Sequence, residues 1–112
     1  MNIQIFGTKK SFDTQKAERY FKERRIKYQY IDILKYGLSN GELESVARVV
    51  GLNNLINSDV KEYKLLNMNM LGSASIREEI LMSNPKLYRT PIVRNGKMAT
   101  VGYKPEIWCT WV

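Results

Sequence analysis

The spacing of apolar and polar positions changes several times along the chain, and each change marks a predicted element. Residues 3–6 alternate with β-favouring side chains before Gly7, which predicts a strand. From residue 14 to residue 25, apolar side chains recur three and four positions apart, as in an amphipathic helix. Residues 28–33 return to a strand-forming composition. This strand–helix–strand order predicts that the two strands are parallel.

The middle of the chain has the spacing of helices. Two pairs with the spacing of a capping box mark helix starts: Ser39 with Glu42, and Ser75 with Glu78. Apolar residues follow both pairs at helical spacing, which predicts one helix to about residue 51 and another to about residue 84. Residues 52–69 predict one or two further short helices.

The last quarter of the chain predicts a hairpin and a short helix. Two β-forming runs, residues 91–94 and 97–101, are joined by Asn95 and Gly96, a strong hairpin signal. The aromatic tail, residues 105–112, predicts a final short helix. The element order therefore predicts a small α/β sheet with a helical insertion.

Length and composition suit one globular domain over residues 1–112. The chain has 112 residues, of which 44% are hydrophobic and 26% are charged. No apolar run approaches the roughly 18–20 residues needed to cross a membrane. Residues 1–6 lack a basic stretch followed by an apolar one, so no signal peptide is predicted. We therefore expect a cytoplasmic protein with no membrane partner.

Cysteine and histidine counts limit the chemistry. The single cysteine, Cys109, excludes an intrachain disulfide and any Cys-x-x-Cys redox or zinc site. The absence of histidine removes Ser-His-Asp and Cys-His pairs. No metal site and no cofactor is predicted. Because Cys109 lies between tryptophans with no adjacent cation, we expect a buried or half-buried packing role for its thiol.

The net charge of +7 favours an acidic partner, which includes nucleic acid or an anionic ligand. Cations crowd the first quarter of the chain at Lys9, Lys10, Lys16, Arg19, Lys22, Arg24, Arg25 and Lys27. A basic patch beside the first loop is one interpretation. An ordinary solvated helix face is the other.

The loop after the first strand is the candidate site, because ligands of α/β sheets gather where strands end and helices begin. Ser11 has two interpretations there. As an N-cap, its hydroxyl accepts from the N–H of Thr14 and contributes about 1 kcal/mol. As a nucleophile, it needs a base, and no histidine is available. Lys9 and Lys10 lie in a loop that does not suggest burial, so the cap is favoured.

Four segments, in the same order, resemble motifs of the arsenate reductase/Spx family. Residues 7–17 match its active-site loop, roughly G-x-x-x-C-x-x-[C/S]-x-K-A, with serine at the first cysteine. The other three segments are residues 26–33, 55–57 and 87–106. The resemblance covers almost the whole chain. It implies a thioredoxin-like, glutaredoxin-like fold with a mixed sheet of about four strands. The helical insertion, at about 39–84, then lies between the second and third strands.

The family's functional positions are mostly lost. The resemblance places its redox cysteine at Ser11, its second cysteine at Thr14, and two of its arginines at Asp59 and Thr90. A further anion-binding arginine falls near Tyr103. A serine hydroxyl cannot form the sulfur–sulfur bonds of thiol–disulfide exchange. A carboxylate at position 59 repels an oxyanion, so cysteine-dependent arsenate reduction is not expected.

The resemblance also implies a cis Thr90–Pro91 bond beside the loop. If the old site is reused for binding, the contact residues are Lys9, Lys10, Ser11, Arg89 and Pro91.

Three hypotheses for function remain. The first is a catalytically degenerate regulatory module that binds a protein, with the RNA polymerase α subunit as the candidate that Spx-like members offer. The second is a glutaredoxin- or glutathione-dependent oxidoreductase whose cysteine is replaced or relocated. The third is a basic nucleic-acid-binding protein, which lacks a recognisable stacking motif.

Overall fold

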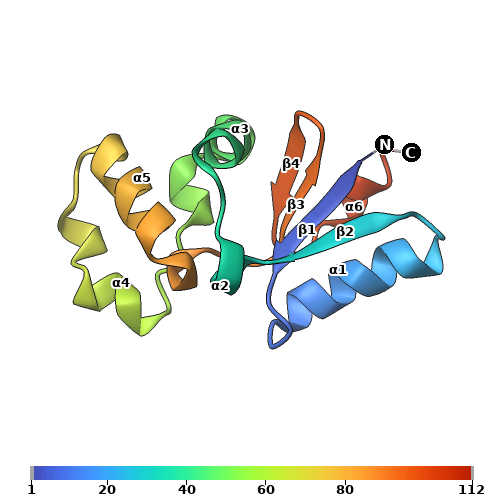
Figure 1. Cartoon of the computed structure of the whole chain (residues 1–112), viewed down its shortest axis with the longest axis horizontal. Helices are drawn as coiled ribbons and strands as arrows, with labels where there is room; N and C mark the ends of the chain where they lie inside the picture. Colours follow the sequence, from blue (N-terminus) through green and yellow to red (C-terminus); the bar gives the residue numbers. More distant parts are fainter. Residues whose placement is uncertain (1, 112) are drawn as a thin grey trace.

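A computed structural model describes residues 2–111 and contains a four-stranded mixed sheet (Figure 1). The strands are β1 (Ile3–Gly7), β2 (Tyr28–Asp32), β3 (Ile92–Asn95) and β4 (Met98–Val101). Their order across the sheet is β2-β1-β3-β4. The β1–β2 pair is parallel and the other two pairs are antiparallel, which confirms the predicted βαβ unit and hairpin. The sheet is thioredoxin-like, as the sequence resemblance implied.

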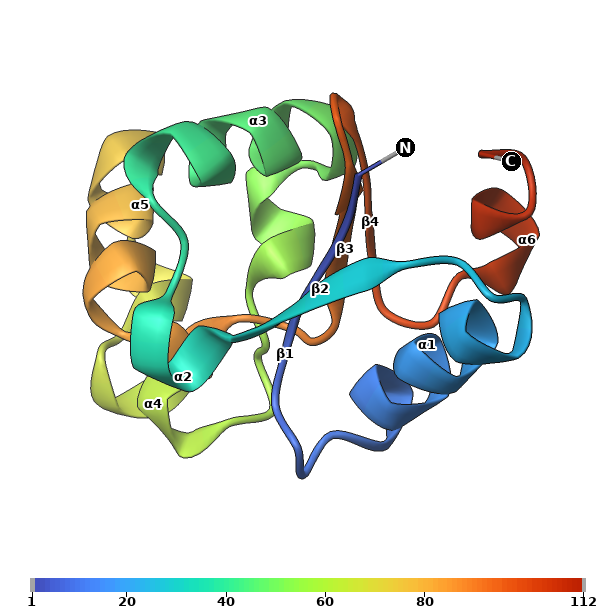
Figure 2. The ribbon, with the colours of Figure 1, turned by 45° about the vertical axis from the view of Figure 1, so that its right-hand side comes forward.

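Helices cover both faces of this sheet (Figure 2). Two of them, α1 (Phe12–Glu23) and α6 (Pro105–Trp108), lie on one face. The other face is covered by segments between β2 and β3, namely α2 (Ile33–Tyr36), α3 (Asn40–Val50), α4 (Lys61–Leu65), α5 (Ala74–Ser83) and the 3₁₀ turns η1 (Leu52–Leu55), η2 (Met68–Met70) and η3 (Pro85–Leu87). No helix in residues 2–111 is long and apolar enough to span a membrane.

Strand alternation divides the apolar residues between two cores. Ile3 and Ile5 pack with α1 and Trp108, whereas Phe6 packs with the helices of the other face. Neighbouring residues of one strand therefore belong to different cores. The β1 strand is packed on both faces, and its last residue, Gly7, is therefore held in place. This fixes the point at which the loop to α1 begins.

Two helix starts differ from the sequence prediction. Helix α1 begins at Phe12, two residues early, because Ser11 serves as its N-cap. The second predicted capping box is wrong: Ser75 lies inside α5, whose N-cap is Ser73. The Ser73 and Ser75 hydroxyls bond each other at 3.0 Å instead of capping the helix. The predicted box at Ser39 is confirmed, with both reciprocal hydrogen bonds present.

Arg77 on α5 ties together the loops of the insertion. Its Nε donates to the Leu71 carbonyl at 2.8 Å, and one terminal nitrogen donates to the Met68 carbonyl at 3.1 Å. The other terminal nitrogen bonds the Asn53 side chain on η1. One half-buried guanidinium thus holds three segments that carry little regular structure of their own.

Replacing Arg77 with alanine is therefore expected to lower the free energy of unfolding by about 2 kcal/mol, since two carbonyls lose a charged donor. Urea denaturation followed by circular dichroism measures this loss. Arg77→Lys keeps the positive charge but lacks the planar set of guanidinium donors. It should recover less than about half of the lost free energy of unfolding. An unchanged free energy of unfolding for Arg77→Ala would show that the guanidinium hydrogen bonds do not stabilise the fold.

Candidate functional site

The loop between β1 and α1 ends in an N-cap. The Ser11 hydroxyl accepts a hydrogen bond from the Thr14 N–H at 3.2 Å, and the Ser11 N–H donates to the Thr8 carbonyl at 3.2 Å. The bond from the Thr14 N–H to the Ser11 hydroxyl is the N-cap predicted from the sequence. Ser11 is half-buried, and no basic side chain bonds its hydroxyl within residues 2–111. The hydroxyl is thus an acceptor for the helix, and no side chain in the described part of the chain is hydrogen-bonded to it to take its proton.

Thr14, at the family's second cysteine position, is a packing residue. It is fully buried, and its side chain lies directly against Gly7 at the end of β1. Its hydroxyl has no hydrogen-bond partner within the described chain. Position 14 therefore fixes the start of α1 against the sheet and presents nothing to a ligand.

The cis Thr90–Pro91 bond, expected from the resemblance, is present just before β3. The residues before the cis bond are held by main-chain hydrogen bonds to η1 and to the residues that follow η1. The Arg89 N–H donates to the Leu55 carbonyl at 2.8 Å, and the Asn57 N–H donates to the Leu87 carbonyl at 2.7 Å. The Arg89 Nε also donates to the Ile56 carbonyl at 3.0 Å. This bond from Nε to the Ile56 carbonyl restrains the exposed guanidinium group of Arg89.

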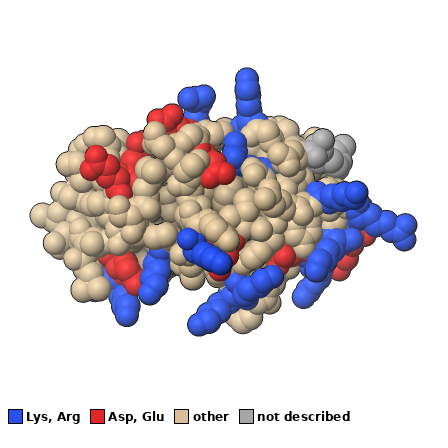
Figure 3. Space-filling view, viewed as in Figure 1, with Lys and Arg blue, Asp and Glu red and all other residues tan. Residues whose placement is uncertain are grey.

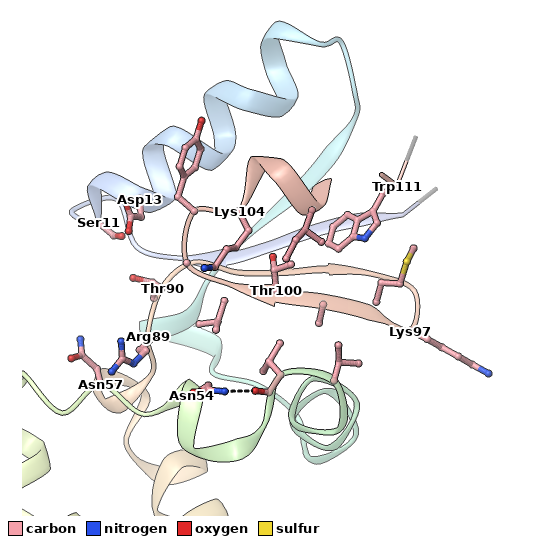
Figure 4. A pocket seen from close by; sticks show the side chains of 18 of the residues that line it. Ser11, Asp13, Asn54, Asn57, Arg89, Thr90, Lys97, Thr100, Lys104 and Trp111 are labelled. Atoms are coloured by element: carbon pink, nitrogen blue, oxygen red, sulfur yellow. Dashed lines mark hydrogen bonds between the residues drawn. The ribbon is translucent and has the colours of Figure 1, made fainter. Parts of the chain in front are cut away.

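A groove of about 1180 Å³ runs from this loop along β4 (Figure 4). It brings together five of the residues singled out in the sequence: Ser11, Asp59, Arg89, Thr90 and Tyr103. Further polar side chains line it as well, among them Asp13, Asn57 and Lys104. In the close-up, Arg89 and Asn57 lie side by side on one wall, and Ser11 and Asp13 lie across from them. We call this feature the groove.

The charges at the loop end of the groove are mixed. Arg89 and Lys104 supply two cations there, and Asp13 and Asp59 supply two carboxylates. The Asn57 side chain accepts from the Asp59 N–H at 2.9 Å, which fixes the turn that carries this carboxylate. An oxyanion such as arsenate would meet nearly balanced charge here instead of a cluster of cations.

The remaining predicted contact residues lie elsewhere. Lys9 stacks over the Tyr30 ring, 4.2 Å from its centroid, and Lys10 is exposed on the loop. Pro91 is buried, so Thr90 is the accessible residue of the cis bond. The groove therefore unites only part of the predicted contact set.

Two tyrosines beside the site keep their protons. Burial, with help from Asp32 and Glu18, raises the pKa of Tyr30, whose hydroxyl donates to the Gly7 carbonyl at 3.3 Å. Burial and then Glu42 raise the pKa of Tyr88 to about 12. Both side chains are neutral near pH 7, so neither supplies a base.

The prediction for Cys109 is wrong, because its side chain is exposed. Its thiol donates to the Glu106 carbonyl at 3.2 Å, within the last turn of α6. Trp108 takes the buried position of that turn, and helical geometry then turns the next residue outward. Cys109 does not line the groove.

Basic side chains gather over α1 (Figure 3). All eight cations of the first quarter are exposed: Lys9, Lys10, Lys16, Arg19, Lys22, Arg24, Arg25 and Lys27. Arg24 stacks on the Tyr20 ring at 3.7 Å from its centroid. Within residues 2–111, no cluster of three or more metal-ligating side chains occurs.

Sequence reasoning missed the β4 side of the groove. Lys104, Thr100 and Trp111 line it, together with the whole of β4. Lys104 lies in the matched segment 87–106, but nothing in the residue pattern shows which strand forms the sheet edge. Only the order of the strands in the sheet identifies β4 as the edge.

The comparisons with known proteins cover nearly the whole chain. A model of the ArsC family matches residues 6–110. The global transcriptional regulator Spx 2 of Oceanobacillus iheyensis is 33% identical over 110 residues, covering 95% of this chain and 80% of that protein. The regulator Spx of Staphylococcus aureus is 25% identical over 108 residues, covering 93% and 82%.

Solved structures show the same fold. A putative ArsC family related protein from Bacteroides fragilis superposes with a TM-score of 0.89 at 23% identity, covering all of this chain and 98% of that one. The arsenate reductase from Vibrio cholerae gives 0.86 at 22% identity, with the same coverage. Together with the family model and the Spx relatives, these matches confirm the resemblance found in the sequence, and this chain belongs to the ArsC family.

Proposed function

We propose that this chain is a non-catalytic ArsC-family protein that regulates transcription by binding a protein partner, with the RNA polymerase α subunit as the first candidate. The observation that carries the proposal is Ser11. At the position that the resemblance aligns with the family's redox cysteine, the hydroxyl accepts from the Thr14 N–H and caps α1, and no side chain within residues 2–111 is hydrogen-bonded to it. A serine hydroxyl at this place cannot form the sulfur–sulfur bond of thiol–disulfide exchange, which is the chemistry that the resemblance assigns to the loop.

The relatives support a regulatory role over a reductive one. The curated matches include proteins named as global transcriptional regulators, and one of them is 33% identical to this chain. The proposal places the chain in the cytoplasm, where RNA polymerase works. Transfer of this role rests on the family likeness, so it requires its own test.

The loop offers a surface that suits a protein partner. Phe12 is 76% exposed at the start of α1, beside the exposed cations Lys9 and Lys10. An exposed aromatic ring next to cations is typical of residues that contribute strongly to protein interfaces. Thr90 and Arg89 lie on the adjoining wall of the groove. We propose these residues as the contact surface.

Capture of the purified α subunit tests the regulatory proposal. The unmodified chain should retain it at low salt, and Lys10→Glu should weaken retention about fivefold or more. Lys64→Glu is the matched control, because it changes the net charge equally at an exposed position on α4. Its retention should stay within about twofold of the unmodified chain. Absence of retention, or equal effects of both variants, would contradict the proposed surface.

A coupled assay of arsenate reduction tests the oxidoreductase alternative. With glutaredoxin and glutathione, the unmodified chain should show no turnover above the background rate. Ser11→Cys restores the thiol but not the cations, so we expect little or no turnover from it either. Turnover by the unmodified chain that persists in Cys109→Ser would refute the non-catalytic proposal. Binding of DNA with a steep salt dependence would favour the nucleic-acid alternative instead.

A further inference from the structure

The free edge of β4 forms part of the lining of the groove. Residues 97–104, which include all of β4, line it without a break. The strand is the outermost of the sheet on this side, because β3 is its only neighbour in the strand order. An outermost strand offers unpaired main-chain donors and acceptors to any extended chain that reaches it.

The pairing register shows which main-chain groups are free. The Gly102 N–H donates to the Pro91 carbonyl at 2.8 Å, and pairs along an antiparallel ladder alternate between bonded and unbonded. Thr100 and Met98 therefore direct their main-chain groups to β3, and Ala99 and Val101 direct theirs outward. Within residues 2–111, these outward groups make no hydrogen bond elsewhere. They form two donor–acceptor pairs on the groove side of the strand.

Apolar walls stand on both sides of this edge (Figure 4). Val49 and Val50 at the end of α3 form one wall, and Ile107 and Trp111 form the other. Val49 and Ile107 are 52% and 40% exposed, so both side chains are accessible to a segment that enters the groove. The walls would bury the side chains of an extended segment, while the strand edge would bind its backbone.

The charges indicate the character of such a segment. Lys97 lies at the hairpin end, and Arg89 and Lys104 at the loop end, against the carboxylates of Asp13 and Asp59. Three cations against two carboxylates leave one positive charge in the groove, on a chain whose net charge is +7. Long-range attraction therefore favours an acidic segment over a basic one.

We propose that the groove binds an extended acidic segment of a protein partner, which adds to the free edge of β4 as a further strand. This proposal deepens the proposed function, since it rests on the chain acting through a protein partner. In this mode the backbone supplies affinity, and alternate side chains supply specificity. One set of side chains would face Val49 and Val50, and the other would face Ile107 and Trp111 with Lys104.

A second copy of this chain fits the edge poorly. It carries the same net charge of +7 and the same groove cations, so long-range repulsion opposes the pairing of two copies. An acidic extended segment has the opposite charge and is attracted instead. Its backbone can reach the outward groups of Ala99 and Val101.

A model peptide tests the proposal directly. The probe is an acetylated and amidated octapeptide of alternating valine and glutamate, added to the full chain labelled with ¹⁵N. At saturation, amide exchange of Ala99 and Val101 should slow at least about tenfold, because these amides gain hydrogen bonds. The same peptide N-methylated on alternate amides should bind at least about tenfold more weakly. No binding by the first peptide, or equal binding by both, would overturn the proposal.

A variant pair checks the contribution of the protein backbone. Val101→Pro removes an outward N–H and leaves the bonds of the β3 ladder, a place where edge strands tolerate proline. It should weaken peptide binding at least about tenfold, and Val101→Thr, which keeps the N–H, should stay within about threefold. If Val101→Pro does not fold, the methylated peptide still decides the question on the unmodified chain.

The outcomes separate this proposal from the proposed function. Slowed exchange at Ala99 and Val101 without capture of the α subunit would support strand addition and count against that partner. Capture that depends on Lys10 but leaves β4 exchange unchanged would keep the regulatory function and overturn strand addition. A concentration-dependent dimer in sedimentation, with Ala99 and Val101 protected in the absence of peptide, would identify a second copy as the occupant and overturn the proposal.

Discussion

Replacing Trp108 with alanine is expected to lower the free energy of unfolding by about 4 kcal/mol, because it empties the centre of one core. The indole is 1% exposed. Its ring lies 5.2 Å from the ring centroids of both Tyr20 and Phe21, and 5.5 Å from that of Tyr103. The helix α6 is only four residues long, so it has little stability apart from this side chain.

The Trp108 indole also joins α6 to the β4 strand. Its Nε1 donates to the Thr100 hydroxyl at 2.8 Å, in the interior between the groove wall and the strand. Trp108→Phe is the matched control, because it keeps most of the ring contacts and loses only this bond. It should cost about 1–2 kcal/mol.

Urea denaturation followed by far-ultraviolet circular dichroism measures both Trp108 variants. The second tryptophan, Trp111, complicates a fluorescence readout. A loss below about 1.5 kcal/mol for Trp108→Ala would show that α6 contributes little to the fold. Peptide binding to the groove should weaken in parallel with stability, because Ile107 and Trp111 would lose their fixed positions.

Much of the fold follows from local pattern. Alternation at residues 3–6 and helical spacing after residue 14 predict β1 and α1, because each period leaves one face apolar. Asn95 and Gly96 predict the hairpin, and the structure places its two-residue turn at Gly96 and Lys97, one position later. These features depend on neighbours in sequence, so a single chain suffices to find them.

The errors arise where tertiary packing decides between equivalent local choices. Ser73 and Ser75 are both chemically able to cap α5, and the helix starts at Ala74 instead of after Ser75. Cys109 could be buried or exposed in an aromatic tail until the helix phase is known. Once Trp108 occupies the core, Cys109 must face away. A helix of four residues is too short for the sequence pattern to show which of its residues face the core.

The candidate site shows the same division. The Ser11 cap could be predicted because its partner lies three residues away. The family resemblance aligned Asp59 and Thr90 with functional positions, and the fold brings both to one groove. The β4 edge could not be found from sequence, because it depends on the strand order β2-β1-β3-β4 and on walls from α3 and α6. Long-range pairing creates that surface.

The contact between Gly7 and Thr14 provides the second large effect. Gly7→Ala is expected to lower the free energy of unfolding by about 3 kcal/mol, because a methyl group there would overlap the Thr14 hydroxyl and methyl groups. The Thr14 side chain is fully buried, so it has no free space into which to rotate. Either β1 or the start of α1 must move, and both position the loop that carries Ser11.

A double-mutant cycle attributes this loss to the contact itself. Thr14→Ala removes the two clashing atoms and leaves only its Cβ, 3.0 Å from the added methyl group. In that background, Gly7→Ala should cost less by about 1–2 kcal/mol, which is the coupling expected of residues in direct contact. Gly41→Ala is the matched control, because apart from the adjoining backbone of its own helix nothing lies within 4 Å of the added methyl group. It should leave the protein as stable or up to about 1 kcal/mol more stable, since alanine favours a helix.

Thermal and urea unfolding of the four Gly7 and Thr14 chains, with Gly41→Ala beside them, completes this test. Additive effects of Gly7→Ala and Thr14→Ala would show that the two residues do not meet. Coupling of the expected sign would give position 14 a structural explanation. A family position that holds a second cysteine in some members would here hold a side chain that locks α1 onto β1. The Ser11 cap would then owe its position to the packing of α1 against the end of β1.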